Sequence, residues 1–230
     1  RSTASTPVID TGIAHPVLDD APAERLEVTV VIPVRDRHAE LARCLAGLTA
    51  PGRPGGVVPA GVTTGPRVIV VDDGSADPAA IQSAAAAAGA GVVRRPVNGG
   101  PAAARNTGLA AAQTPLVAFL DSDCVPGTGP ANWLDALLPH FADPAVGAVA
   151  PRIVPHEAGR TWLARYEGAS STLDMGRRPS IVRPGSRVPY VPGAAMVVRS
   201  EAAGPGFAED MQVGEDVDFV WRLAASGWRV

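Results

Sequence analysis

Two aspartates one residue apart, Asp121 and Asp123, directly follow an apolar run from Leu116 to Leu120. Such a run indicates a short buried strand, and α/β proteins bind nucleotides and metals at the edge where these strands end. Carboxylates this close repel each other unless a cation or a hydrogen-bonding ligand compensates their charge. The Asp121-Ser122-Asp123 stretch therefore predicts a divalent cation, Mg²⁺ or Mn²⁺, that carries phosphate. Turn and helix-cap chemistry is the alternative interpretation of the same residues.

Polar residues follow three other apolar segments in the same way. Asp36 comes after the first segment, Asp72 and Asp73 after the second, and Asn98 with Gly99 after the third. Turn propensity alone does not explain this gathering, because the turns expected at the opposite edge carry no similar set of acids. The Asn98-Gly99 stretch also begins a predicted helix, where backbone N–H groups can bind phosphate or sugar oxygen. A plain helix cap is the alternative there.

Further charged residues lie on predicted helices. Arg105 falls one to two turns into the helix after Gly99, where its planar guanidinium could bind a diphosphate, although a solvated surface arginine is equally expected. Glu215 and Asp216 follow Gly214 at the start of another helix, which would hold both acids rigidly at the rim of the sheet. Acids also stabilise any helix N-terminus, which is the alternative reading of this pair.

Alternating strands and helices must bring these loops together. Buried strands are predicted over residues 28–33, 68–71, 92–93 and 116–120, each of the first three followed by a helix that ends near residue 50, 89 or 112. Three consecutive strand–helix units predict an α/β fold, a three-layer α/β/α sandwich with a doubly wound, mostly parallel sheet. Helices near 132–141 and 215–226 and strands near 146–154 and 188–198 follow, and at least one later strand is expected to run antiparallel, giving a mixed sheet.

The predicted organisation is one domain over residues 28–230. Residues 1–27 are rich in Ser, Thr, Pro and Asp without periodicity, which predicts a flexible leader, and the Pro/Gly stretch 53–66 predicts a surface loop. The chain stops at Val230, just after a helix stop at Gly227 and at the start of another strand pattern. We therefore expect this domain to be truncated at its C-terminal end, as a piece of a longer protein.

Composition excludes several classes of function. All 20 basic residues are arginine, so a P-loop lysine, a Schiff-base lysine and a lysine general base are excluded. The net charge of −3, without an evident basic cluster, argues against a nucleic acid partner. Cys44 and Cys124 are too few for a zinc cluster or a disulfide framework, which favours a cytoplasmic setting. No apolar run has the length of a membrane span, and membrane association of a longer protein stays open.

Five blocks of sequence resemble, in order and spacing, the signature blocks of family 2 inverting glycosyltransferases. They are Val31–Arg35, Val71–Ser75, Asn98–Asn106, Phe119–Asp123 and Gly214–Phe219. The resemblance covers residues 28–230 and implies the GT-A type of Rossmann-like fold. Within this family, the Arg35/Arg37 pair, Cys124, Trp133, the stretch 183–192 and Trp221 look like the glycosyltransferases of the mycofactocin system, which add glucose to a peptide-derived redox cofactor.

The resemblance implies a role for each matching residue. Asp73 would accept a hydrogen bond from the uracil of a UDP-sugar, Asp121 would lie on the ribose and metal side, and Asp123 would ligate the metal. Asp216 would be the general base, with Glu215 and Trp221 on the acceptor side. The full set implied for nucleotide-sugar binding is Pro33, Val34, Arg35, Asp72, Asp73, Asn98, Gly99, Arg105, Asp121, Ser122 and Asp123.

The predicted function is therefore a metal-dependent, inverting transfer of a hexose, with glucose expected, from a UDP-sugar to a hydroxyl of a peptide-derived small molecule or glycan. A sugar nucleotidyltransferase is disfavoured because Pro33–Arg37 is not a glycine-rich, lysine-bearing loop. A processive polysaccharide synthase would need membrane helices and a Gln-x-x-Arg-Trp block, which would have to lie past Val230. The third alternative is a non-catalytic module that binds a nucleotide-sugar or a peptide.

Overall fold

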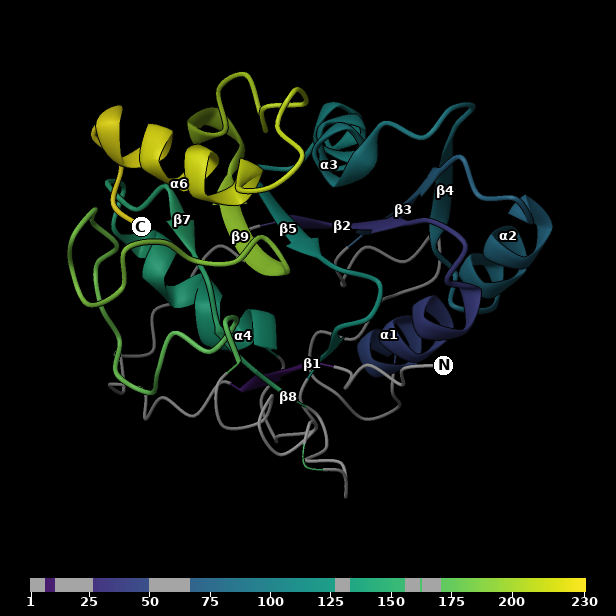
Figure 1. Cartoon of the computed structure of the whole chain (residues 1–230), viewed down its shortest axis with the longest axis horizontal. Coiled ribbons are helices and arrows are strands. Elements are labelled where there is room, and N and C mark those ends of the chain that lie inside the picture. Colours follow the sequence, from purple (N-terminus) through teal and green to yellow (C-terminus); the bar gives the residue numbers. More distant parts are fainter. Residues whose placement is uncertain (1–6, 11–26, 50–66, 127–132, 156–161, 163–170) are drawn as a thin grey trace.

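A six-stranded mixed sheet forms the centre of the protein (Figure 1). The computed structural model describes residues 7–10, 27–49, 67–126, 133–155, 162 and 171–230. The strand order is β4-β3-β2-β5-β9-β7. The strands are β2 (Val28–Val34), β3 (Arg67–Asp73), β4 (Gly91–Arg95), β5 (Leu116–Leu120), β7 (Ala148–Val149) and β9 (Ala195–Arg199). The first four strands pair in parallel, and β9 runs antiparallel to both β5 and β7, as the expected mixed sheet requires.

Helices cover both faces of this sheet, which makes the predicted three-layer α/β/α sandwich. Figure 1 shows α3 (Gly100–Ala111) and α6 (Glu215–Ala225) on one side, and α1 (His38–Thr49), α2 (Pro78–Ala87) and α4 (Trp133–Leu137) on the other. Because successive side chains of a strand point to opposite faces, β2 and β3 divide between two cores. Val30 and Ile32 belong to the core under α1 and α2, whereas Val31 belongs to the core under α3.

The contact between α3 and β2 is unusually close. Gly108 faces Val31, and a Cβ on Gly108 would lie 2.2 Å from a Val31 methyl carbon. Val31 is fully buried, so its side chain has no free space into which it could move. The glycine thus lets α3 lie close to the sheet, which sets the position of Arg105 one turn earlier in the helix.

A second, three-stranded sheet of order β6-β1-β8 corrects one prediction. Its strands are β1 (Pro7–Asp10), β6 (Val125–Pro126) and β8 (Arg152–Pro155). Order was expected to begin near Val28, yet β1 lies between β6, with which it is parallel, and β8, with which it is antiparallel. A four-residue segment with proline carries no periodic signal, so its pairing depends on partners distant in the sequence. The other residues of the predicted leader and the predicted loop 53–66 lie outside the described ranges, apart from Glu27.

Proline and glycine account for the remaining differences. The strand expected over 188–198 is limited to β9, because Pro189, Pro192 and Gly193 precede it. The strand expected over 146–154 is divided into β7 and β8, which flank Pro151. The helix expected over 132–141 continues past α4 as a 3₁₀ helix, Leu138–Ala142. Within the described ranges, no helix is both long and apolar enough to cross a membrane.

Candidate active site

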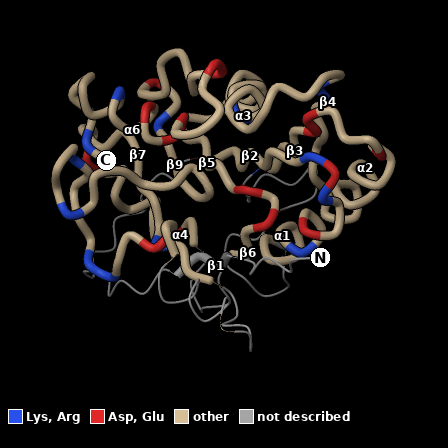
Figure 2. The backbone as a smooth tube through the Cα atoms, in the orientation of Figure 1, with Lys and Arg blue, Asp and Glu red and all other residues tan. Residues whose placement is uncertain are grey.

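The carboxylates predicted after β5 lie at the end of a fully buried strand. Each of the five residues of β5 is buried, whereas the side chains of Asp121 and Asp123 are 31% and 36% exposed. Asp121 donates its backbone N–H to Ala194 O at 2.8 Å and accepts from Cys124 N at 3.0 Å, which fixes the turn. Figure 2 shows acidic residues here and near the end of β3. The predicted gathering of acids at the strand ends is therefore present.

Arg105 connects this turn to the start of α6. Its Nη2 donates to Asp121 Oδ1 at 2.8 Å, and its Nη1 donates to Glu215 Oε1 at 2.9 Å. Only 4% of the Arg105 side chain is exposed, so the solvated-arginine interpretation is wrong. Burial lowers the pKa of the Arg105 guanidinium, but the charges and hydrogen bonds of Asp121 and Glu215 outweigh this, and the net shift is upward. Arg105 therefore stays charged between its two acids.

The start of α6 holds the predicted general base in a defined orientation. Gly214 precedes the helix with φ of +86°, a conformation that favours glycine. Asp216 accepts from Gly193 N at 2.9 Å through Oδ2 and from Val217 N at 2.8 Å through Oδ1. A Cβ on Gly193 would lie 3.1 Å from Asp216 Cβ and 3.3 Å from Arg105 Cζ, so glycine permits this close approach.

Asp123 forms an ion pair that the sequence did not indicate. Arg37 Nη1 lies 2.8 Å from Asp123 Oδ2, on a contact between residues 86 positions apart. Burial raises the pKa of the Asp123 carboxyl, the negative charge of Asp121 raises it further, and Arg37 opposes both effects. The two carboxylates therefore repel each other, and a divalent cation bound between them would relieve this repulsion.

The donor set is suitable for such a cation. Arg37 and Arg105 each bond one oxygen of their aspartate, so each carboxylate has a second oxygen that neither arginine binds. Hard carboxylate oxygens are the ligands that Mg²⁺ and Mn²⁺ prefer. Among the described residues, however, no cluster of three or more His, Cys, Asp or Glu side chains could hold a metal. Water or a phosphate ligand would have to complete the coordination.

Asp72 and Asp73 at the end of β3 have arginine partners on β4. Asp72 accepts from Ser75 N at 2.9 Å and forms a short ion pair with Arg94. Asp73 accepts from Arg95 Nε at 2.8 Å, and backbone N–H groups of the α3 start also bond to it. Both aspartates are buried. The uracil role of Asp73 stays a prediction. Both oxygens of this carboxylate already accept hydrogen bonds, so uracil would have to bind beside these donors or replace one of them.

The helix start at Asn98 and Gly99 differs from the expectation. Gly99 N and Gly100 N donate to the Asp73 carboxylate, at 3.0 and 2.9 Å, so these N–H groups are not free for phosphate. The side chain of Asn98 accepts from Gly100 N at 3.2 Å and caps the turn. The N-cap of α3, Gly99, has no side-chain capping bond, and a role of Asn98 and Gly99 in nucleotide-sugar binding stays a prediction.

Three of the remaining predicted residues, Val34, Arg35 and Asp36, lie at the end of β2 and in the loop that follows it. Val34 is buried and Arg35 is exposed beside Asp36, at 3.5 Å. Asp36 has φ of +58° and bonds to the β3 loop, donating to Ser75 Oγ at 2.9 Å and accepting from Ala76 N at 2.7 Å. These two hydrogen bonds fasten the loop after β2 to the loop after β3.

The two residues predicted on the acceptor side, Glu215 and Trp221, differ in their exposure to solvent. Glu215 is 9% exposed and bonds Arg105, so in this structure its carboxylate belongs to the ion-pair network. Trp221 is 44% exposed and donates its indole N–H to Pro189 O at 2.8 Å. The sequence analysis used Arg37 as a family marker but not as the partner of Asp123, and it did not single out Gly193. The charged block around Arg37 and the Pro192-Gly193 dipeptide are the sequence signals that could have found them.

Comparisons with known proteins agree with this architecture. The sequence profile described as glycosyl transferase family 2 matches residues 29–203. A pre-mycofactocin glycosyltransferase of Mycobacterium tuberculosis is 47% identical over 226 residues, which are 97% of this chain but 44% of that protein. The chain therefore spans less than half the length of this relative.

Two solved structures have the same fold. The mannosyltransferase PcManGT from Pyrobaculum calidifontis, in complex with GDP-Man and Mn²⁺, has a TM-score of 0.62 at 22% identity, over 93% of this chain and 56% of its own. Residues 1–349 of S. aureus TarS, in complex with UDP-GlcNAc, have a TM-score of 0.63 at 20% identity, over 86% of this chain and 53% of that one. The likeness to both concerns the backbone architecture.

Proposed function

This chain belongs to glycosyl transferase family 2 and has the α/β architecture of the GT-A fold, and we propose that it transfers a hexose from a nucleotide-sugar to an acceptor hydroxyl with inversion. The observation that carries the proposal is the Asp121–Arg105–Glu215 network. It joins the strand edge expected to bind the donor to the helix that carries Asp216. Donor and base positions are thereby held in one rigid arrangement, which catalysis by orientation requires.

Asp216 is suited to act as the base on the acceptor side. Its carboxylate is fixed by the N–H groups of Gly193 and Val217, so the side chain cannot rotate freely. In an inverting transfer the acceptor oxygen forms a bond to the anomeric carbon, the bond to the diphosphate breaks, and the acceptor proton passes to a carboxylate. Asp216 would receive this proton while the electron pair leaves with the diphosphate.

Asp121 and Asp123 would hold a divalent cation. When bound, Mg²⁺ or Mn²⁺ supplies positive charge against the departing diphosphate. The residues of the chain position the donor around it: Arg105 orients Asp121, and Arg37 orients Asp123. The raised pKa of Asp123 supports this assignment, because burial beside Asp121 disfavours two uncompensated charges.

The finer assignment is UDP-glucose as donor and a pre-mycofactocin peptide derivative as acceptor. Its support is the 47% identity to the M. tuberculosis protein named for that acceptor, together with the sequence blocks around Asp73 and Trp221. The two solved structures contain nucleotide-sugars with different nucleobases, GDP-Man in one and UDP-GlcNAc in the other. The fold alone therefore does not determine which nucleobase is bound. Asp72 and Asp73 are the residues proposed to make that choice.

The test compares two aspartates on the same helix. Asp218 is four residues before Arg222, pairs with it at 2.8 Å, and is half-buried like Asp216. With full-length enzyme, UDP-glucose and Mn²⁺, Asp216→Asn should lower transfer by about 10² to 10⁴ while UDP-glucose affinity changes by no more than a few-fold. Asp218→Asn should retain most of the activity. Near-normal transfer by Asp216→Asn would reject the base assignment, and absence of UDP release by the native enzyme would favour a non-catalytic binding module.

A further inference from the structure

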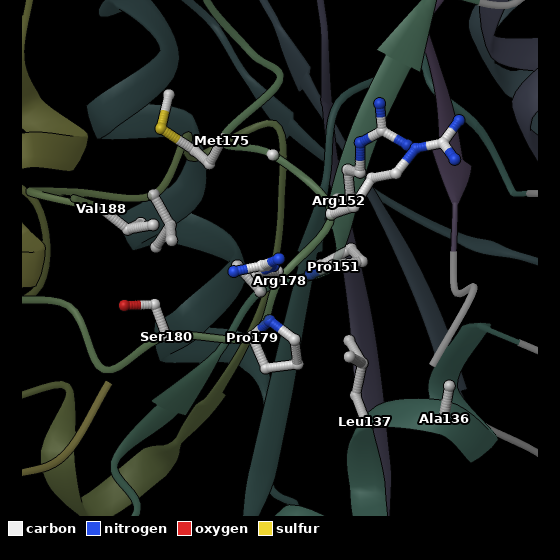
Figure 3. A pocket seen from close by; sticks show the side chains of 13 residues that line it. Ala136, Leu137, Pro151, Arg152, Met175, Arg178, Pro179, Ser180 and Val188 are labelled. Carbon is white, nitrogen blue, oxygen red and sulfur yellow. The ribbon is translucent and has the colours of Figure 1, made fainter. Parts of the chain in front are cut away.

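A cavity of about 360 Å³ lies between α4, β8 and the segment 175–191. Figure 3 shows Leu137, Met175 and Val188 around it together with Arg178 and Ser180. Its volume is within the range of small-molecule sites, which combine apolar walls with a few polar groups. The mixed lining indicates a ligand with an apolar body and a charged or polar group.

The arginines of this cavity are unequally neutralised. Arg152 forms a two-point ion pair with Asp174, at 2.7 and 2.6 Å, and the hydrogen bond from Arg152 is the main cause of the lowered pKa of Asp174. Arg177 and Arg178 also line the cavity. Neither has an ion-pair or hydrogen-bond partner among the described residues. Arg177 lies near enough to Asp174 to help lower its pKa, but Asp174 is paired with Arg152, and no acid of the described residues pairs with Arg178.

The surrounding segment strengthens this positive charge. Residues 177–187 contain four arginines and no acid, in a chain whose net charge is −3. One of them, Arg187, has its Nη2 3.6 Å from the position of a Cβ on Gly176, a residue that lines the cavity. Like charges brought together without an acid create a local potential that attracts an anion. The sequence analysis found no evident basic cluster because only Arg177 and Arg178 are adjacent, and uncharged residues separate them from Arg183 and Arg187.

The cavity is also connected to the proposed base. Val191 forms part of its wall, and two residues later Gly193 donates its N–H to Asp216. Two residues of extended chain span at most about 7 Å, so the cavity wall and the backbone that holds Asp216 are close. Trp221 holds the same segment through its hydrogen bond to Pro189 O.

We propose that this cavity binds the anionic end of an acceptor that has an apolar body, with Arg177 and Arg178 recognising a carboxylate or phosphate group. This assignment rests on the proposed transferase function for its link to the acceptor, but the binding site can be tested without turnover. The apolar walls would cover the body of the ligand, and the rim arginines would discriminate charged from neutral analogues.

The experiment measures binding of three probes to the full-length protein by calorimetry. Phenylpropanoate, phenyl phosphate and the neutral phenylpropanamide present an apolar ring with a carboxylate, a phosphate or no charge. At least one anion should bind about tenfold or more tightly than the amide, and the stronger anion identifies the recognised group. Arg178→Gln should weaken that anion about tenfold, whereas Arg183→Gln, which alters an exposed arginine of the same segment outside the cavity lining, should change binding by less than twofold.

Three outcomes would overturn the proposal. Equal binding of anions and amide would exclude recognition by the arginines. Equal losses in Arg178→Gln and Arg183→Gln would indicate a diffuse surface field. Binding of phosphatidylglycerol vesicles without binding of any probe would assign the arginines to a membrane surface. If anion binding is intact while Asp216→Asn keeps full transfer, the proposed base fails and the cavity assignment stands, so the two failures are distinguishable.

Discussion

The ion pairs of Arg105 make a quantitative prediction about stability. Arg105→Met removes the guanidinium of a side chain that is only 4% exposed but keeps an apolar side chain beside Phe207, whose ring centre lies 5.4 Å from Arg105 Cζ. Glu215, with 11% of its side chain exposed, then lacks a counter-charge, while Asp121 at 31% can still be hydrated. Removing one partner of a buried ion pair costs about 3–5 kcal/mol, and Glu215 should account for most of it.

The assay is urea unfolding followed by tryptophan fluorescence, since Trp133 is buried in the core. Arg105→Met should lower the free energy of unfolding by about 3–5 kcal/mol. Adding Glu215→Gln to this variant should recover about 2 kcal/mol, because the orphaned charge is gone. Arg43→Gln removes an exposed i,i+3 pair with Glu40 and should cost less than about 0.5 kcal/mol.

Two results would refute this reasoning. A loss below about 1 kcal/mol in Arg105→Met would mean that Glu215 finds water or another donor once the guanidinium is removed. A double variant no more stable than Arg105→Met would mean that the destabilisation comes from packing around Phe207 and not from the unpaired charge.

Three other predictions concern packing, pH and metal. Gly108→Ala should destabilise the protein by about 1–3 kcal/mol because its Cβ would collide with Val31, and the stabilisation usual for this change in a helix would contradict the close approach of α3 to β2. The lowered pKa of Asp174 means that its pairing with Arg152 stabilises the fold above the unfolded-state pKa of about 4 and is lost as pH falls through the folded-state value. The difference in unfolding free energy between native protein and Asp174→Asn should therefore shrink in acid, and a constant difference would disprove the linkage. UDP binding should weaken on chelation of divalent ions, and Asp123→Ala should remove the dependence on Mn²⁺; equal calorimetric affinity in chelator and Mn²⁺ would exclude a metal-bridged site.

Sequence patterns predicted those elements whose signal is local. The β-branched run at Val28 and the apolar run at Leu116 each became a strand of the main sheet, and Asp121 followed its strand as expected. Strand β1 was missed because its pairing partners begin at Val125 and Arg152, more than 100 residues away. Short segments of this kind are specified by tertiary contacts and leave little trace in their own residues.

The candidate site shows the same division. The strand ends indicated where the carboxylates would gather, but not which arginine would pair with each carboxylate. Arg105 and Glu215 are 110 positions apart, and Arg37 and Asp123 are 86 positions apart. No spacing rule connects such pairs, because the crossover connections of a parallel sheet bring distant loops to one edge. Arg105 likewise has its close neighbours Gly193, Phe207 and Glu215 far along the chain.

Because this chain has no lysine, each side-chain ion pair that the described residues form at the strand ends has a guanidinium as its cation. Guanidinium groups keep their proton throughout the range in which enzymes are assayed. The positive charge around Asp72, Asp73, Asp121 and Asp123 is consequently constant between mildly acidic and strongly alkaline solution. A pH profile of donor binding would therefore have no alkaline limb from a side-chain amine. Amine-directed labelling would likewise leave all of these ion pairs unmodified.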